Sequence, residues 1–256
     1  MKTKVTIMGC GSSMGVPRPD GYWGKCDPKN KKNYRTRCSL LITQGKNNIL
    51  IDTSPDLRSQ LLSNNVKNVS YVLYTHKHGD QTHGINDLRV FYIKSRKKLD
   101  IFANKETIAY LYQNFTYLFN GNFGYPPILR KNKVKKRFSL GLKNEKIYFR
   151  SFEVKHGNIF SLAYVFKKVA YISDCSFISK KDFKNLFNLN MLIIDCLWFR
   201  KHCAHFNYDE VIKLINILKP KKTILTNMHA DLDYKYLKKK VPKNVFPAYD
   251  GMKLYV

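Results

Sequence analysis

The chain has 256 residues, and its 46 Lys and Arg outnumber its 18 Asp and Glu, which gives a formal net charge of +28. Hydrophobic residues make up 44% and aromatic residues 14% of the chain, a composition that excludes a mainly disordered protein. No apolar run approaches the roughly 18 residues of a membrane span, and the N-terminus lacks the apolar core of a signal peptide. We therefore expect a soluble, cytoplasmic protein with no membrane partner.

Short apolar runs alternate with helical patterns along the chain. The pattern predicts strands over residues 4–10, 39–43, 48–53, 71–75, 99–103, 147–154, 162–166, 169–173, 191–196, 223–226 and 253–256. It predicts helices over residues 55–64, 81–93, 105–119, 180–186, 208–218 and 234–241. Because strands dominate early and then alternate with helices, we expect a single α/β domain over residues 1–256, with two sheets in its interior.

The helix predicted over 208–218 has well-defined ends. Asn207 is a favourable N-cap, and Glu210 three residues later completes the pattern of a capping box. Pro220 stops the helix after its last turn. The apolar residues at helical spacing, which predict a buried face, are Val211, Leu214, Ile215 and Leu218.

The segment at about 120–146 breaks the alternation of strands and helices. It contains Tyr125, Pro126 and Pro127, followed by a run from Arg130 to Arg137 in which six of eight residues are basic. We predict that this segment forms an inserted basic loop.

The seven His residues lie in four short segments, and three of these segments follow closely after a predicted strand. In the first segment, His76 and His78 follow the strand over 71–75, and Asp80 comes two residues later. Side chains two positions apart on an extended chain point the same way, and a carboxylate two residues further on can reach an adjacent metal ion. This spacing is typical of a metal site.

Three further strand ends carry groups of the same chemistry. Asp174 comes directly after a predicted strand, and His156 and His229 come two and three residues after two others. A single His at a strand end is more often a hydrogen-bonded structural residue, so each position alone is a weak signal. Their joint occurrence with the first segment predicts one metal site built from several strand ends.

Three other motifs carry a resemblance to a known family. Residues 9–17 read GCGSSMGVP, residues 52–56 read DTSPD, and residues 205–207 read HFN. Together with the His segments, they resemble the metallo-β-lactamase superfamily, and most closely the branch that contains phosphoribosyl cyclic phosphate phosphodiesterase. The resemblance implies an α/β fold, the four-layer αβ/βα sandwich, with metal ions at one edge between the two sheets.

The resemblance also implies two divalent metal ions, zinc or manganese, and a role for each residue of the motifs. The implied ligands are His76, His78 and His156 for the first ion, Asp80 and His229 for the second, and Asp174 as a bridge between both. Asp80 and His205 are the implied catalytic residues, and His205 would supply the leaving group with a proton or a positive charge.

One residue departs from the family pattern, because Asp80 is usually followed by His and is followed here by Gln81. A neutral amide oxygen is a poorer ligand for zinc than an imidazole. Three readings stay open: Gln81 still ligates the second ion, His83 replaces the missing ligand, or the second site is partly vacant. We expect the second ion to be held more weakly than the first.

The six Cys residues are scattered along the chain, which argues against a disulfide scaffold. Related phosphodiesterases can carry a structural zinc in the neighbourhood of Cys26 and Cys38, where they have a tighter Cys cluster than this chain. A structural zinc and a pair of buried thiols are the two readings of these residues.

The leading function is a metal-dependent hydrolase, a phosphodiesterase that acts on a small or cyclic phosphodiester through a metal-activated hydroxide. Its expected partner is a small anionic substrate. The alternatives are an RNA-processing nuclease of the same fold, a thioester or lactone hydrolase, and a degenerate binding protein that has lost turnover. Because 36 of the 46 basic residues are Lys, the charge fits compositional drift, and a nucleic-acid partner is not favoured.

Overall fold

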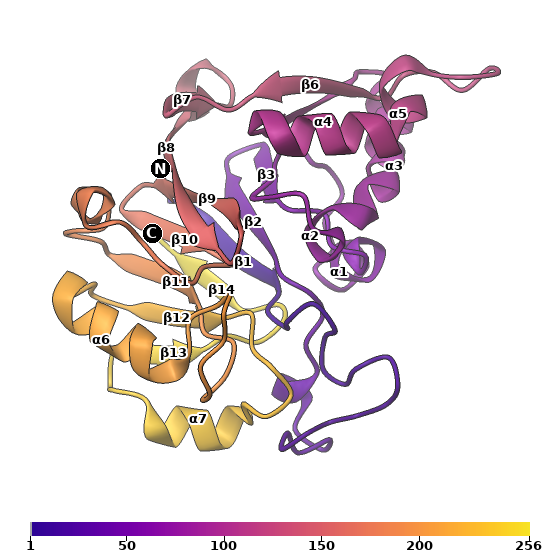
Figure 1. Cartoon of the computed structure of the whole chain (residues 1–256). Helices are drawn as coiled ribbons and strands as arrows, with labels where there is room; N and C mark the ends of the chain where they lie inside the picture. The colour runs from indigo at the N-terminus through magenta and orange to yellow at the C-terminus, as the bar shows by residue number, and fades with distance from the viewer. Residues whose placement is uncertain (1) are drawn as a thin grey trace.

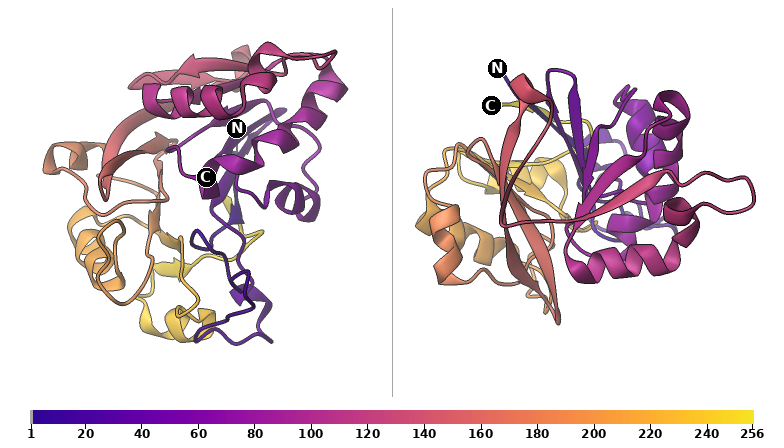
Figure 2. Two further views of the ribbon diagram at one scale, coloured as in Figure 1. Left: turned by 45° about the vertical axis from the view of Figure 1, so that its right-hand side comes forward. Right: turned by 90° about the horizontal axis from the view of Figure 1, so that it is seen from above.

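The computed structural model describes residues 2–256, apart from the side chain of Lys143, and these residues form two seven-stranded β-sheets. The sheets lie in the middle of the molecule, and helices cover their outer faces (Figure 1 and Figure 2). The expected αβ/βα sandwich is confirmed.

The first sheet is mixed and joins the two ends of the chain. Its strands, in spatial order, are β14 (Lys253–Tyr255), β1 (Lys4–Gly9), β2 (Ser39–Gln44), β3 (Asn47–Ile51), β4 (Tyr71–Leu73), β5 (Leu99–Ala103) and β6 (Leu129–Lys133). The N-terminal and C-terminal strands pair antiparallel. β3 and β4 are parallel, so their carboxyl ends meet at one edge of the sheet.

The second sheet is also mixed. Its strands, in spatial order, are β13 (Val245–Pro247), β12 (Thr223–Thr226), β11 (Met191–Asp195), β10 (Val169–Ile172), β9 (Ile159–Phe166), β8 (Ile147–His156) and β7 (Arg137–Leu140). β10, β11 and β12 are parallel, and β8 runs in the same direction because β9 is antiparallel to both β8 and β10. The carboxyl ends of these four strands therefore meet at one edge.

The helices pack on the outer faces of the sheets. They are α1 (Leu57–Ser63), α2 (Gly79–Thr82), α3 (Arg89–Ser95), α4 (Lys105–Asn114), α5 (Thr116–Asn120), α6 (Tyr208–Leu218) and α7 (Tyr234–Lys240), with short 3₁₀ helices η1 (Lys31–Asn33), η2 (His83–Leu88), η3 (Lys143–Glu145) and η4 (Lys180–Asn185). Apolar residues of α1, α3, α4 and α5 form one core with the first sheet. The larger core lies between the sheets and extends to α6. No helix within residues 2–256 has the length and apolar character needed to cross a bilayer.

Every predicted strand is present, and the helix over 208–218 begins with the expected capping box of Asn207 and Glu210. Two predicted helices are divided. The segment 81–93 forms α2, η2 and part of α3, and the segment 105–119 breaks at Phe115, whose φ of −128° and ψ of 37° are not helical. The helix predicted over 180–186 is the 3₁₀ helix η4.

The prediction of an inserted loop at about 120–146 is wrong for two parts of that segment. Residues 129–133 form β6 at the edge of the first sheet, and residues 137–140 form β7 at the edge of the second. Both are edge strands, where basic residues hinder pairing with other chains. The high charge therefore concealed two strands, and the missed strand β13 is likewise a short edge strand that ends in Pro247.

Candidate metal centre

The carboxyl ends of six strands meet around one cavity. His156 is the last residue of β8, Asp174 comes two residues after β10, and His76 comes three residues after β4. The cavity has a volume of about 740 Å³. The predicted site residues that line it are His78, Asp80, His156, Asp174, His205 and His229.

Three imidazoles converge at this edge. Nε2 of His76 lies 3.0 Å from Nδ1 of His78, and Nε2 of His156 lies 3.2 Å from the same Nδ1 atom. All three nitrogens lie within 4.8 Å of one another. Burial lowers the pKa of His76 to about 3, so its imidazole is neutral and can act as a ligand.

Hydrogen bonds on the far side of the rings determine the tautomers of two of these residues. Thr75 donates its hydroxyl proton to Asp52 (2.9 Å), which leaves the Thr75 oxygen to accept from Nδ1–H of His76 (3.0 Å). Nδ1–H of His156 donates to the carbonyl of Ala204 (2.8 Å). Both residues therefore present an Nε2 lone pair to His78, as metal-binding imidazoles do.

These observations test the first metal position that the family implies. Two ring nitrogens that carry lone pairs face a third nitrogen at close range, and a cation satisfies all three at once. His76, His78 and His156 therefore fit a transition-metal ion.

The neighbouring carboxylates are bridged by Gln81, whose side chain is fully buried. Its Nε2 donates to Oδ2 of Asp80 at 3.2 Å and to Oδ2 of Asp174 at 3.3 Å, while its Oε1 is buried without a hydrogen-bond partner. Burial and the charge of Asp174 raise the pKa of Asp80 to about 6. Burial alone would raise the pKa of Asp174, but the surrounding imidazoles lower it, so this carboxylate stays ionised.

The second metal position fits less well. His229 lines the cavity, but its ring stacks on Trp198 and its Nδ1 accepts from the backbone N–H of Asp231. Among the described residues, His229 does not join Asp80 and Asp174 in a group of three potential ligands. The hydrogens of Gln81 occupy carboxylate lone pairs that a second cation would need.

His205 lies beside the first position. Its Nδ1 is 2.7 Å from Oδ2 of Asp195, and its ring centroid is 4.6 Å from that of His156. Burial would lower the pKa of His205, but the charge and hydrogen bond of Asp195, with the charge of Asp174, raise it to about 9. A ring nitrogen of His205, one of His156 and a carboxylate oxygen of Asp174 lie within 4.8 Å of one another, so these three side chains could also hold a metal ion.

The remaining candidates lie elsewhere. His83 is exposed, and its Nε2 lies 2.9 Å from the hydroxyl of Tyr110, outside the residues that line the cavity. Cys26 and Cys38 are buried and belong to no group of three potential ligands among the described residues. The structure therefore favours the reading of two buried thiols over a structural zinc.

Several residues of the site were not predicted. Asp195 ends β11, and Asn227, directly after β12, donates to both Asp174 (3.3 Å) and Asp195 (3.2 Å). Asp52 and Asn227 both adopt left-handed backbone, with φ of 64° and 59°. Asp195 had a detectable signal, because it is a carboxylate at the end of an apolar strand, as Asp174 is. Asn227 had none, because an amide after a strand is a common turn residue.

Arg35 is a further residue of this region, and its guanidinium is buried without an ion-pair partner in the described part of the chain. It donates to the carbonyls of His229 (3.4 Å) and Leu232 (2.7 Å). Because a buried donor that is charged forms strong hydrogen bonds, Arg35 holds the loop that carries His229.

Residues 47–228, most of the chain, match a family model described as the beta-lactamase superfamily domain. The chain belongs to the metallo-β-lactamase superfamily. Within this superfamily, the chain is similar to a crystal structure described as a new diphosphatase from the PhnP family, with 28% identity and a TM-score of 0.89 over 100% of this chain and 98% of that one. This similarity matches the phosphodiesterase branch that the motifs indicated.

Two further comparisons are informative. Zn(2+)-bound PqqB from Methylobacterium extorquens shares the fold, with a TM-score of 0.79 and 14% identity over 98% of this chain and 99% of that one. A protein of Porphyromonas gingivalis named octanoyltransferase is 28% identical over 98% of this chain and 51% of its own length. The chain thus spans about half the length of that curated relative.

Proposed function

We propose that the protein is a metal-dependent hydrolase that cleaves a small or cyclic phosphodiester. The observation that carries this proposal is the convergence of three imidazole nitrogens near Asp174, with the His205–Asp195 pair next to them in the same cavity. The imidazoles are suited to a cation, and His205 can supply a proton. Cleavage of a phosphate ester needs both.

His76, His78, His156 and Asp174 would hold the cation. Zinc or manganese bound there would polarise phosphoryl oxygens and lower the pKa of a coordinated water. Binding of zinc by the similar PqqB supports a divalent ion in this position. The donation of both Gln81 hydrogens to carboxylates supports one tightly held ion and a weaker second one.

His205 is the proposed proton donor. Its pKa of about 9 keeps the ring protonated at neutral pH, and Asp195 fixes Nδ1, which leaves Nε2–H for the substrate. An alkoxide leaving group accepts this proton as its bond to phosphorus breaks. Asn227 holds Asp195 and Asp174 in place through its amide hydrogens, so it acts on the reaction by positioning these carboxylates.

Hydrogen-bond donors for an anionic substrate line the cavity. They include Ser12, Ser13 and Arg18, whose guanidinium also forms an ion pair with Asp20. The volume of about 740 Å³ suits a small ligand better than a folded RNA. The name diphosphatase for the 28% identical structure supports chemistry at phosphorus.

A panel of substrates tests the proposal. Protein loaded with zinc or manganese is assayed against bis(p-nitrophenyl) phosphate, a cyclic nucleotide, a precursor tRNA and a thioester, with Asp80→Ala as the matched variant. We expect turnover of the first two substrates and loss of that turnover in Asp80→Ala. Cleavage of the tRNA alone would identify a nuclease, and silence on all four would identify a binding protein.

Acyl chemistry is a second candidate, supported by the name of the Porphyromonas relative, which refers to octanoyl transfer. Hydrolysis of an octanoyl thioester, with no turnover of phosphodiesters, would favour this candidate over the first. In that reaction the cation would polarise the carbonyl oxygen, and His205 would donate a proton to the leaving group.

Gln81→His is expected to increase retention of a second metal ion. The imidazole offers a lone pair in place of the amide hydrogens that now occupy Asp80 and Asp174. After dialysis against a weak chelator, we expect about one ion per chain in the wild type and close to two in the variant, because imidazole binds zinc better than an amide does. Elemental analysis measures this ratio, and Gln113→His, on the exposed face of α4, controls for the added imidazole. Two firmly held ions in the wild type would contradict the expectation.

A further inference from the structure

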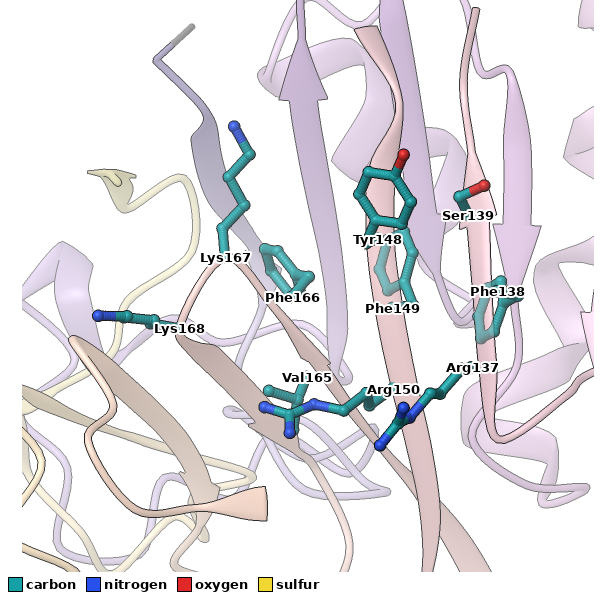
Figure 3. A pocket seen from close by; sticks show the side chains of 10 residues that line it. All are labelled: Arg137, Phe138, Ser139, Tyr148, Phe149, Arg150, Val165, Phe166, Lys167 and Lys168. Atoms are coloured by element: carbon teal, nitrogen blue, oxygen red, sulfur yellow. The ribbon is translucent and has the colours of Figure 1, made fainter. Parts of the chain in front are cut away.

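A second cavity, of about 660 Å³, lies at the other end of β8 from the metal centre. β7, β8 and the turn between β9 and β10 form it, and it shares no lining residue with the first cavity (Figure 3). Arg150 in this cavity is six residues from His156 along β8. At about 3.3 Å per residue, the two sites are roughly 20 Å apart along the strand.

Two arginines face each other in this cavity. Arg137 on β7 and Arg150 on β8 are directly opposite in the antiparallel ladder, and both are exposed. Like charges in directly opposed positions destabilise a sheet. Neither guanidinium has an ion-pair partner in the described part of the chain.

Both side chains extend in the same direction. In Figure 3, Arg137 reaches towards β8, and Arg150 reaches across the sheet towards Val165 of β9. The stem of Arg150 covers the buried Val165, which explains the position of that side chain. No such contact explains Arg137. A phosphate group would satisfy both guanidinia, since each can form paired hydrogen bonds to phosphate oxygens.

An aromatic ring lies beside the two arginines. Tyr148 is two residues before Arg150, so both side chains are on the same face of β8. The side chain of Tyr148 is 74% exposed. Lys168, at the neighbouring turn, adds another exposed positive charge to the lining. Surfaces that bind single-stranded nucleic acid combine exposed aromatic rings with positively charged side chains.

We propose that this cavity binds a segment of single-stranded nucleic acid, with a phosphate between Arg137 and Arg150 and a base stacked on Tyr148. An acidic peptide would use the charges and gain little from the ring. The proposal does not rest on the phosphodiesterase activity, because none of its residues contacts the metal centre.

Fluorescence anisotropy with a labelled single-stranded oligouridylate of about ten nucleotides, the length range that one such surface covers, tests the proposal. The full-length protein is used after treatment with EDTA, so that cleavage does not interfere and failure of the proposed enzymatic function leaves the result unaffected. We expect Arg137→Gln/Arg150→Gln to raise the Kd at least tenfold. The slope of log Kd against log salt should fall by about 0.7, which corresponds to the one phosphate that the two arginines neutralise. Tyr148→Ala should raise the Kd at least about fivefold.

The control is Lys235→Gln/Lys239→Gln, which removes the same charge from exposed positions on α7. This variant should bind the oligonucleotide nearly as well as the wild type. An equal loss in both double variants, or no loss in the arginine variant, would overturn the proposal. So would equally tight binding of poly-glutamate, or full displacement of the strand by equimolar uridine monophosphate. A thermal unfolding curve checks that the arginine double variant is folded. Its midpoint should not lie below that of the wild type, because the substitutions remove two opposed like charges.

Discussion

Alanine in place of His78 is expected to lower turnover by at least about 10³-fold, because a lost ligand removes several kcal/mol of transition-state stabilisation and each 1.36 kcal/mol is tenfold in rate. Nδ1 of His78 is the atom that both other imidazoles face, at 3.0 and 3.2 Å. Its side chain is exposed, so the substitution should leave the fold intact. Turnover and the metal content of the purified protein are the two measurements.

His83→Ala is the matched control for this prediction. His83 lies five residues away, is also exposed, and contacts Tyr110 outside the cavity. We expect turnover and metal content within about twofold of the wild type, as for most exposed substitutions. Equal effects of the two substitutions, or full metal content in His78→Ala, would show that the three-imidazole cluster is not the metal site.

Glutamine in place of His205 is expected to lower kcat by about 10² to 10⁴, the usual contribution of a positioned acid or base. The loss should depend on the leaving group. A p-nitrophenyl ester leaves readily without a proton and should lose little, whereas an alkyl ester needs the proton and should lose most. Initial rates on both ester types, with substrate saturating, measure this difference.

His202→Gln, in the same loop, is the control for His205. The two rings lie 5.1 Å apart, and the His202 ring is exposed. This variant should keep its rate on both esters. A loss of metal from His205→Gln would instead identify His205 as a ligand, in line with its proximity to His156 and Asp174. An equal loss on both esters would exclude proton donation.

The first metal position could be predicted from the sequence because its ligands follow strands. A residue directly after a parallel strand lies at a known edge of the sheet, so His76, His156 and Asp174 were expected to meet, and they do. The strands themselves were visible as apolar runs. β6 and β7 were not, because only Leu129 and Leu140 of these two edge strands are buried.

The sequence could not show how well the second metal position binds an ion. The spacing places Gln81 near Asp80, but it does not show which end of the amide faces the carboxylates. His83 was an equally good candidate on spacing, and only its contact with Tyr110 separates it from the site. Asn227 was missed because its contribution lies in long-range hydrogen bonds, to residues 53 and 32 positions away.

The left-handed backbone at Asp52 and Asn227 bears on the stability of the site. Left-handed conformation costs a residue with a side chain of the order of 1 kcal/mol, and glycine avoids this cost. Glycine would nevertheless remove buried side chains that orient His76, through Thr75, and the carboxylates of Asp174 and Asp195. A buried polar group left without a partner costs about 1–3 kcal/mol, which exceeds the backbone cost. We therefore expect glycine at either position to lower the stability of the fold and to displace the metal-binding residues together.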